Sequence, residues 1–276
     1  MSNQWALTLL VLFFAASAAC SKEETEPRPV DSGTPFDGTS DVWDGASSDS
    51  GVDAVSDGTD DDAADAGPVV RLDAKSITKF AEPLVIPPAM APVAKTAERT
   101  DYAIAARQFQ QQVLPRPLPK TTVWGYGKEG DPLPGAGASS FNYPGFTVEA
   151  RTNEKVRVRW INGLKAADGK ALRHLFTVDP TLHWANPPGP IDSVGAPGAP
   201  YAGPVPIVAH VHGAHVPSAS DGHPQAWFLP AATDIPSGYA TRGTYFASAV
   251  TSPAGEAVFD YPNDQPATTL WYHDHA

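Results

Sequence analysis

The sequence of 276 residues predicts an all-β domain, a sandwich or barrel of short strands, behind a long polar N-terminal region. Beyond residue 98, β-branched and aromatic residues alternate with other residues in several short segments, which is the period of a strand. Stretches rich in proline and glycine separate these segments, the longest at 185–204, and no segment has a convincing helical period. Short strands joined by turns are therefore expected.

Residues 1–19 are predicted to be an export signal. The run from Trp5 to Ala19 is apolar, too short to span a bilayer comfortably, and ends in small side chains. The stretch from Ser17 to Cys20 resembles a bacterial lipoprotein processing site, which would make Cys20, the only cysteine, the lipid-bearing first residue of an outer-membrane or cell-surface lipoprotein. The alternative is ordinary cleavage and release as a soluble periplasmic or secreted protein. Either way, the domain is expected to be exported.

Residues 20–68 are predicted to be a disordered acidic tether rich in serine, glycine and aspartate, since such a composition cannot offset its ordering entropy by burial. The segment 21–66 carries 14 acidic and two basic residues, which equals the net charge of −12 of the whole chain. The remaining charges cancel, and no basic patch with interleaved aromatic residues is present. The sequence therefore argues against nucleic-acid binding.

A proline-broken lead segment at 69–98 is expected to precede the folded domain at 99–276. In the segment 154–163, Val156, Val158 and Trp160 face one way and the intervening arginines face the other, as in a sheet with one face in water. The predicted strands are 101–113, 121–126, 145–150, 154–163, 204–212, 255–262 and 268–275.

Two His-x-His pairs, His210 with His212 and His273 with His275, lie at the ends of predicted strands. Residues i and i+2 of a strand project from the same face, so each pair presents two imidazoles side by side. Neutral imidazole binds zinc, copper, nickel and iron, and affinity in the divalent series peaks at copper. Four exposed strand histidines without a ligand would explain neither the pairing nor its surroundings. The pattern therefore predicts a metal site.

The other aromatic and histidine side chains are expected to have simpler roles. Trp227, Phe228 and Trp271 are predicted to pack in the core or against the wall of the metal cluster. The histidines that are not expected to be ligands are His174, His183, His215 and His223.

The segments HVHGAHVPSASDGHPQAWF at 210–228 and LWYHDHA at 270–276 resemble the first two copper-binding motifs of multicopper oxidases, in particular spore-coat-type laccases and bilirubin oxidases of bacteria. The similarity runs from about residue 72 to the last residue. It implies that the domain is a cupredoxin-like (plastocyanin-like) Greek-key β-sandwich. Shorter stretches that agree with the family are Lys79-Phe80, Ile86-Pro87, Trp124-Gly125-Tyr126, Tyr143-Pro144-Gly145 and Trp160-Ile161-Asn162.

Residue by residue, the resemblance implies that His210 binds the type 2 copper and that His212, His273 and His275 bind the type 3 copper pair. In the family these ions reduce dioxygen to water, with electrons from phenolic, aromatic amine or metal-ion substrates. Asp221 stands where the family has an acidic residue near the cluster. It is either a proton relay or a side chain that caps its loop.

The resemblance also implies that much of the oxidase lies outside this sequence. The other half of the cluster ligands, and the cysteine of the type 1 copper, belong in the family to a last cupredoxin domain, whereas the only cysteine here is Cys20. The strand after the second motif is also expected to be missing. We expect the truncated N-terminal portion of an exported oxidase, inactive alone. The alternatives are one chain of a split oxidase, completed in trans, and a non-catalytic, surface-tethered copper-binding module.

Overall fold

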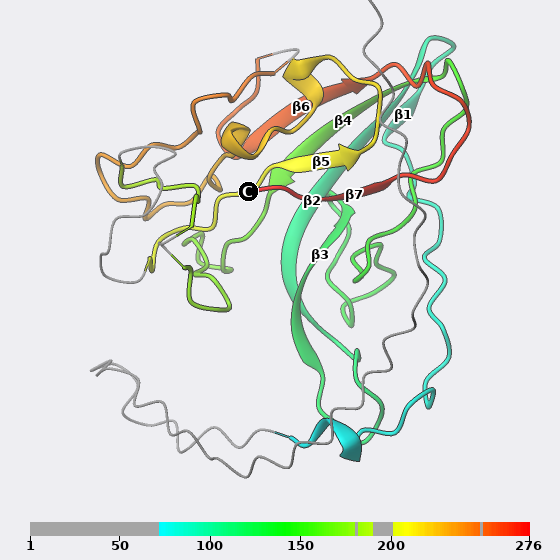
Figure 1. Ribbon diagram of the computed structural model, residues 1–276, viewed down its shortest axis with the longest axis vertical. Helices are drawn as coiled ribbons and strands as arrows, with labels where there is room; N and C mark the ends of the chain where they lie inside the picture. The colour runs from blue at the N-terminus through cyan, green and yellow to red at the C-terminus, as the bar shows by residue number, and fades with distance from the viewer. Residues whose placement is uncertain (1–71, 180–181, 190–200, 249–250) are drawn as a thin grey trace, which may run out of the picture. The chain divides into compact units, whose positions relative to one another are not determined.

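The computed structural model describes residues 72–179, 182–189, 201–248 and 251–276 (Figure 1). The predicted signal, the tether with Cys20 and the first three residues of the lead segment lie outside the described residues. Within the described ranges the only helices are three short 3-10 turns, so none is long and apolar enough to cross a membrane. These turns are η1 (Ala74–Ser76), η2 (Ser218–Ser220) and η3 (Pro224–Ala226).

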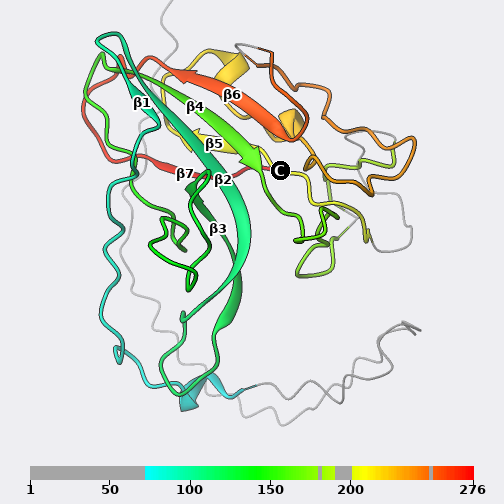
Figure 2. The same ribbon diagram turned by 180° about the vertical axis from the view of Figure 1, so that it is seen from behind.

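Two sheets make up the domain. The larger sheet contains β1 (Ala94–Lys95), β2 (Arg99–Gln111), β3 (Thr121–Lys128), β4 (Lys155–Asn162) and β6 (Glu256–Tyr261), and the smaller one contains β5 (Ala209–His212) and β7 (Trp271–Asp274). The long strand β2 pairs in parallel with β4 along one edge and antiparallel with β1 and β3 along the other, and β6 completes the sheet beside β4. Figures 1 and 2 show the β5–β7 ribbon across one face of the larger sheet.

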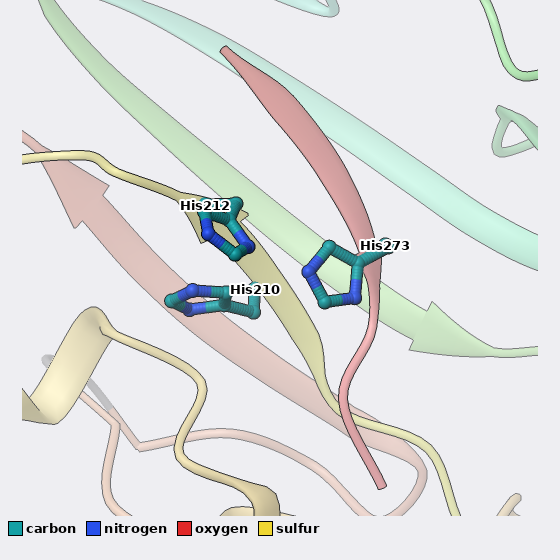
Figure 3. Close-up of side chains that lie close together, drawn as sticks. All are labelled: His210, His212 and His273. Carbon is teal, nitrogen blue, oxygen red and sulfur yellow. The ribbon is translucent and has the colours of Figure 1, made fainter. Parts of the chain in front are cut away.

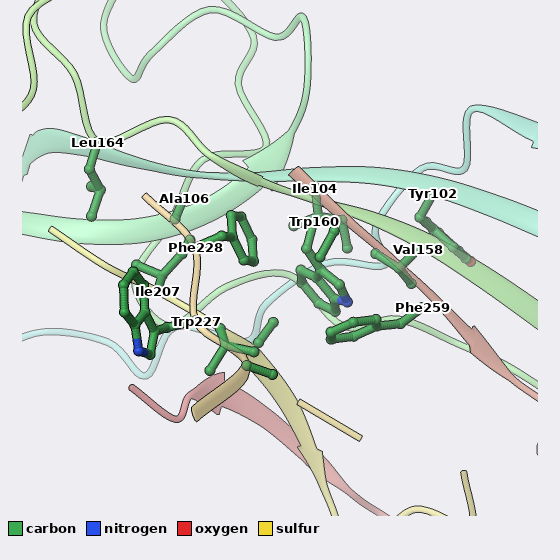
Figure 4. Packing of buried hydrophobic residues seen from close by; sticks show 14 of the residues in the cluster. Tyr102, Ile104, Ala106, Val158, Trp160, Leu164, Ile207, Trp227, Phe228 and Phe259 are labelled. Carbon is green, nitrogen blue, oxygen red and sulfur yellow. The ribbon is translucent and has the colours of Figure 1, made fainter. Parts of the chain in front are cut away.

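One hydrophobic core joins the two sheets. Trp160 of β4 is 2% exposed and donates a hydrogen bond from Nε1 to the Tyr261 hydroxyl of β6, 3.0 Å away. The segment that leads into β5 contributes the buried Ile207 and Val208, and the loop after it contributes Trp227 and Phe228 (Figure 4). Trp227 and Phe228 are fully buried, so the prediction that they pack in the core is confirmed. The expected all-β sandwich is also confirmed.

The two faces of β4 differ as the sequence predicts. Val156, Val158 and Trp160 are buried against the core. On the other face Arg157 pairs with Asp260 at 2.6 Å, and the neighbouring arginine pairs with Glu256 at 2.7 Å. One face of β4 is therefore packed against the core, and the other carries cross-strand ion pairs to β6.

The predicted strand at 145–150 is wrong. Thr147 alone forms a bridge, to Ala89 of the lead segment, through bonds to the main chain of Pro88 and Met90. Because proline has no N–H to donate, the lead segment cannot extend this ladder. The other six predicted strands are present, but those at 204–212 and 268–275 are reduced to the four residues of β5 and of β7.

Candidate metal centre

The β5–β7 ribbon brings the two His-x-His pairs together. The strands are antiparallel, with His210 opposite His273 and His212 opposite Trp271. Because alternate residues of a strand share a face, the side chains of these two cross-strand pairs project from the same face of the ribbon. Figure 3 shows His210, His212 and His273 with their rings turned toward one another. The strand register therefore assembles the site from segments that are far apart in the sequence.

Four imidazoles form the cluster. The ring centroids of His210, His212 and His273 are 5.5–5.7 Å apart, and one ring nitrogen from each lies within 4.8 Å of the others. His275, just beyond β7, stacks on His210 with a centroid distance of 4.4 Å and an interplanar angle of 22°. It lies 5.3 Å from the ring of His273. The four histidines singled out in the sequence thus lie in one group, called here the four-histidine cluster.

Main-chain carbonyl groups orient two of these rings. The Nδ1 atom of His210 lies 2.5 Å from the carbonyl oxygen of Asp221, and the Nδ1 atom of His275 lies 2.8 Å from that of Gly222. A carbonyl oxygen only accepts hydrogen bonds, so each Nδ1 carries the proton. The lone pair of each imidazole is then on Nε2, the atom available to a metal.

His273 supplies the observation that tests whether a metal fits. Its Nδ1 atom is 2.7 Å from the carbonyl oxygen of Asp274, whereas its Nε2 atom is buried and has no hydrogen-bond partner among the described residues. An unsatisfied buried polar atom is unfavourable, and a metal ion would use its lone pair. An all-imidazole donor set suits copper. The residues present therefore fit the metal that the resemblance implies.

Asp221 lies beside the four-histidine cluster. Its carboxylate Oδ1 is 3.7 Å from Nδ1 of His210, and 41% of the side chain is exposed. Its backbone N–H, just after η2, donates to the carbonyl oxygen of Ser218, the first residue of η2, at 3.4 Å. The side chain therefore connects the edge of the cluster with solvent, while the main chain closes the loop.

Asp274 was not singled out by the sequence analysis, although it separates the two histidines of the second pair. Its carboxylate accepts a hydrogen bond from the N–H of Val208 at 2.9 Å, and the backbone N–H groups of His275 and Ala276 act on its pKa in the same direction. Burial of this carboxyl raises its pKa to about 6, and the three N–H donors oppose the increase. The signal available in the sequence was its position between the two histidines of a His-x-His pair, which in a strand places its side chain on the opposite face of the ribbon.

The other four histidines lie in different surroundings. His174 packs between Trp124 and Tyr201, and burial lowers the pKa of its imidazole. Both His183 and His223 contact Gln225, and His215 lies 3.7 Å from an exposed aspartate. None of these four belongs to the metal-ligand group found within the described residues.

Comparison with known proteins gives relatives of one kind. No family model matches the chain. A laccase of Bacillus stratosphericus is 33% identical over 201 residues, and a laccase of Bacillus subtilis (strain 168) is 31% identical over 201 residues; each match covers 73% of this chain and 30% of the relative. A laccase of Haloferax volcanii is 34% identical over 203 residues, covering 72% of this chain and 28% of the relative.

Solved structures give a weaker likeness of the same kind. A multicopper oxidase from Campylobacter jejuni has a TM-score of 0.40 at 16% identity, covering 74% of this chain and 27% of that one. A multicopper oxidase from Pediococcus acidilactici has a TM-score of 0.39 at 17% identity, covering 72% and 26%. Likeness at this level carries no argument beyond the sequence relation.

Fold and site together define a β-sandwich domain that presents a histidine cluster suited to a metal ion. The part of the chain that the laccases match belongs to the multicopper oxidase family, and the expected cupredoxin-like fold is the fold of that family's domains. The chain spans about 30% of the length of the curated relatives it matches.

Proposed function

We propose that this chain is a copper-binding N-terminal cupredoxin domain of an exported, laccase-like multicopper oxidase. The observation that carries the proposal is the convergence of three ring nitrogens from β5 and β7, with His275 stacked on His210 beside them. The buried Nε2 atom of His273 has no hydrogen-bond partner in the described part of the chain. The laccase relatives supply the choice of copper. The four-histidine cluster is then a set of copper ligands.

Within this proposal His210 binds the type 2 copper, and His212, His273 and His275 bind the type 3 pair. Bound copper supplies the one-electron steps that reduce dioxygen to water. The chain's own contribution is to hold Nδ1 of His210 and of His275 protonated against the loop carbonyls, which leaves Nε2 to the metal. The Asp221 carboxylate, close to His210 and partly exposed, relays protons from solvent to the cluster.

The proposed oxidase needs further cupredoxin domains. The laccase relatives are more than three times as long as the region that matches this chain. In the proposed oxidase, domains that correspond to the rest of a laccase would supply the remaining copper ligands and the type 1 copper. They would also hold the site of a phenolic, aromatic amine or metal-ion substrate. They would act in cis or in a second chain. Export, with attachment to a membrane through a lipid on Cys20, remains part of the proposal.

A second candidate function is a non-catalytic, surface-tethered copper-binding module. One observation favours it: three ring nitrogens converge within this chain alone, so metal binding does not need another domain. Both candidates predict copper binding, and they differ in activity once the missing domains are supplied.

The proposal is tested by copper(II) titration of the full chain. The wild type is expected to bind copper(II), as measured by calorimetry and by electron paramagnetic resonance of the bound ion. The double variant His210→Ala/His273→Ala is expected to lose this binding, because each strand loses a ligand. His183→Ala, an exposed histidine outside the cluster, serves as the matched control and is expected to bind like wild type.

Two results would contradict the proposal: a wild-type chain without affinity for copper, or a double variant that binds as well as wild type. Oxidation of a phenol separates the candidates. The chain alone is expected to be inactive, since its only cysteine is Cys20. Activity on addition of domains that carry a His-Cys-His motif supports the oxidase, and continued inactivity with copper bound supports the module.

A further inference from the structure

Trp271 occupies the one position of the ribbon face that is not a histidine. The cross-strand pairs on this face are His210 with His273 and His212 with Trp271. Three of these four side chains supply the converging ring nitrogens. The indole therefore lies next to the ligands as the fourth member of a two-by-two array.

The indole stacks on two ligands that come from different strands. Its ring centroid is 4.1 Å from that of His273 with an interplanar angle of 25°, and 5.0 Å from that of His212 with an angle of 18°. Both angles are small, so the two imidazoles lie nearly flat against the same aromatic group. A ring in this position limits rotation of both imidazoles about their side-chain bonds.

This contact replaces a restraint that the other half of the cluster has. His210 and His275 are each oriented by a loop carbonyl. Among the described residues, His212 has no recorded ring hydrogen bond, and His273 has one only to its sequence neighbour Asp274. Metal-binding histidines normally need such an outer contact to fix the ring. Among the described residues, Trp271 is the one aromatic side chain outside the four-histidine cluster that contacts both of these rings.

A simple packing role does not explain Trp271. Its side chain is 58% exposed, whereas Trp160 and Trp227 are buried in the core. A large apolar ring held in solvent gains little from burial. Its contacts with the two ligands are what distinguish its position.

We infer that Trp271 is a positioning residue, which holds His212 and His273 in the ring orientation that binds copper. The inference rests on the proposed function, because it assigns Trp271 a role toward the same metal. It predicts that loss of the indole weakens copper binding without removing any ligand.

The test uses the full chain, with copper(II) as the probe. Trp271→Ala and Trp271→Leu are expected to bind copper(II) about tenfold more weakly than wild type, the size of effect seen when a contact behind a ligand is removed. Their paramagnetic resonance spectra are expected to change because the ligand rings are reoriented. Trp271→Phe keeps an aromatic face for stacking and is expected to retain most of the affinity and the wild-type spectrum.

Fluorescence gives a readout in the folded wild type. Of the seven tryptophans in the chain, Trp271 alone among the described ones is recorded in contact with a cluster histidine. Copper(II) is expected to quench its emission strongly, so the wild type should lose more fluorescence on titration than Trp271→Phe. Thermal unfolding of each variant without copper controls for folding, which the exposed position of Trp271 should leave intact.

The outcomes separate this inference from the proposed function. If the wild type binds copper and Trp271→Ala shows unchanged affinity and an unchanged spectrum, the inference is wrong and the proposed function stands. The inference is also wrong if Trp271→Phe binds copper as weakly as Trp271→Ala, or if copper quenches the fluorescence of wild type and of Trp271→Phe equally. A wild-type chain that does not bind copper overturns both.

Discussion

At the scale of single residues, the turn at Asp221 and Gly222 decides which ring nitrogen of two histidines in the four-histidine cluster stays free for the proposed metal. The carbonyl oxygens of these residues hold Nδ1 of His210 and of His275. Gly222 has a φ of +73°, and a Cβ atom there would collide with the carbonyl oxygen of Ala209, at the start of β5. The turn can approach the strand this closely because the residue is glycine.

Gly222→Ala is therefore expected to reduce the free energy of unfolding and to weaken copper binding. The left-handed backbone costs a non-glycine residue about 1–2 kcal/mol. Gly238→Ala is the matched control, because Gly238 has a φ of +87° with open space around the added methyl. Urea unfolding should show the larger loss for Gly222→Ala, and copper titration should show weaker binding for that variant alone. If the two variants lost the same free energy of unfolding and bound copper equally well, the close approach of the turn to Ala209 would be unimportant for stability and for the metal site.

At the scale of elements, Glu154 connects the entry of β4 to two other strands. Its carboxylate accepts hydrogen bonds from Lys95 of β1 at 2.9 Å and from Thr100 of β2 at 2.8 Å. These two bonds hold the pKa of the Glu154 carboxyl below its ordinary value of 4.5. The ionised side chain thus helps to fix the parallel register of β2 and β4.

Because this pKa is lowered on folding, the stabilisation is complete above the ordinary pKa of 4.5 and is lost as the pH falls through the lower folded value. Glu154→Gln should therefore be less stable than wild type at pH 7, with a difference that shrinks toward pH 3. Urea unfolding at several pH values measures it. The control is Glu98→Gln, since Glu98 is exposed and has no recorded ion pair among the described residues. A difference that stays constant with pH would exclude this role for Glu154.

The same scale shows what could be predicted from the sequence. The period-two pattern predicts β4 and its two faces, because one side of that strand is buried and the other carries ion pairs. It fails at 145–150, where the segment that pairs with it among the described residues is interrupted by Pro87 and Pro88. The period-two pattern of a segment does not show whether the segment that pairs with it, far away in the sequence, has the N–H groups needed to form a strand ladder.

For the whole molecule, the His-x-His spacing predicts which imidazoles share a face but not how two strands meet. The register that places His210 opposite His273 and His212 opposite Trp271 is set by packing of the ribbon on the core. The hydrogen bonds that His210 and His275 donate to the carbonyl oxygens of the turn at Asp221 and Gly222 also depend on that packing. Residue types and spacing therefore indicate the metal, whereas the orienting contacts require the fold.

The ribbon joins segments far apart in the chain, so a metal bound there links β5 to β7 and should stabilise the whole domain. An ion that binds only the folded state raises the free energy of unfolding by about 2.7 kcal/mol at a free concentration of 100 times Kd. Urea unfolding with buffered copper(II) and with a chelator should show this increase for wild type and for His183→Ala. The double variant His210→Ala/His273→Ala should show none, because the cross-strand pair that closes the site is gone. Copper stabilises the chain only through a site that exists in the folded state. If copper raised the free energy of unfolding of the double variant as much as that of wild type, that site would lie elsewhere on the chain.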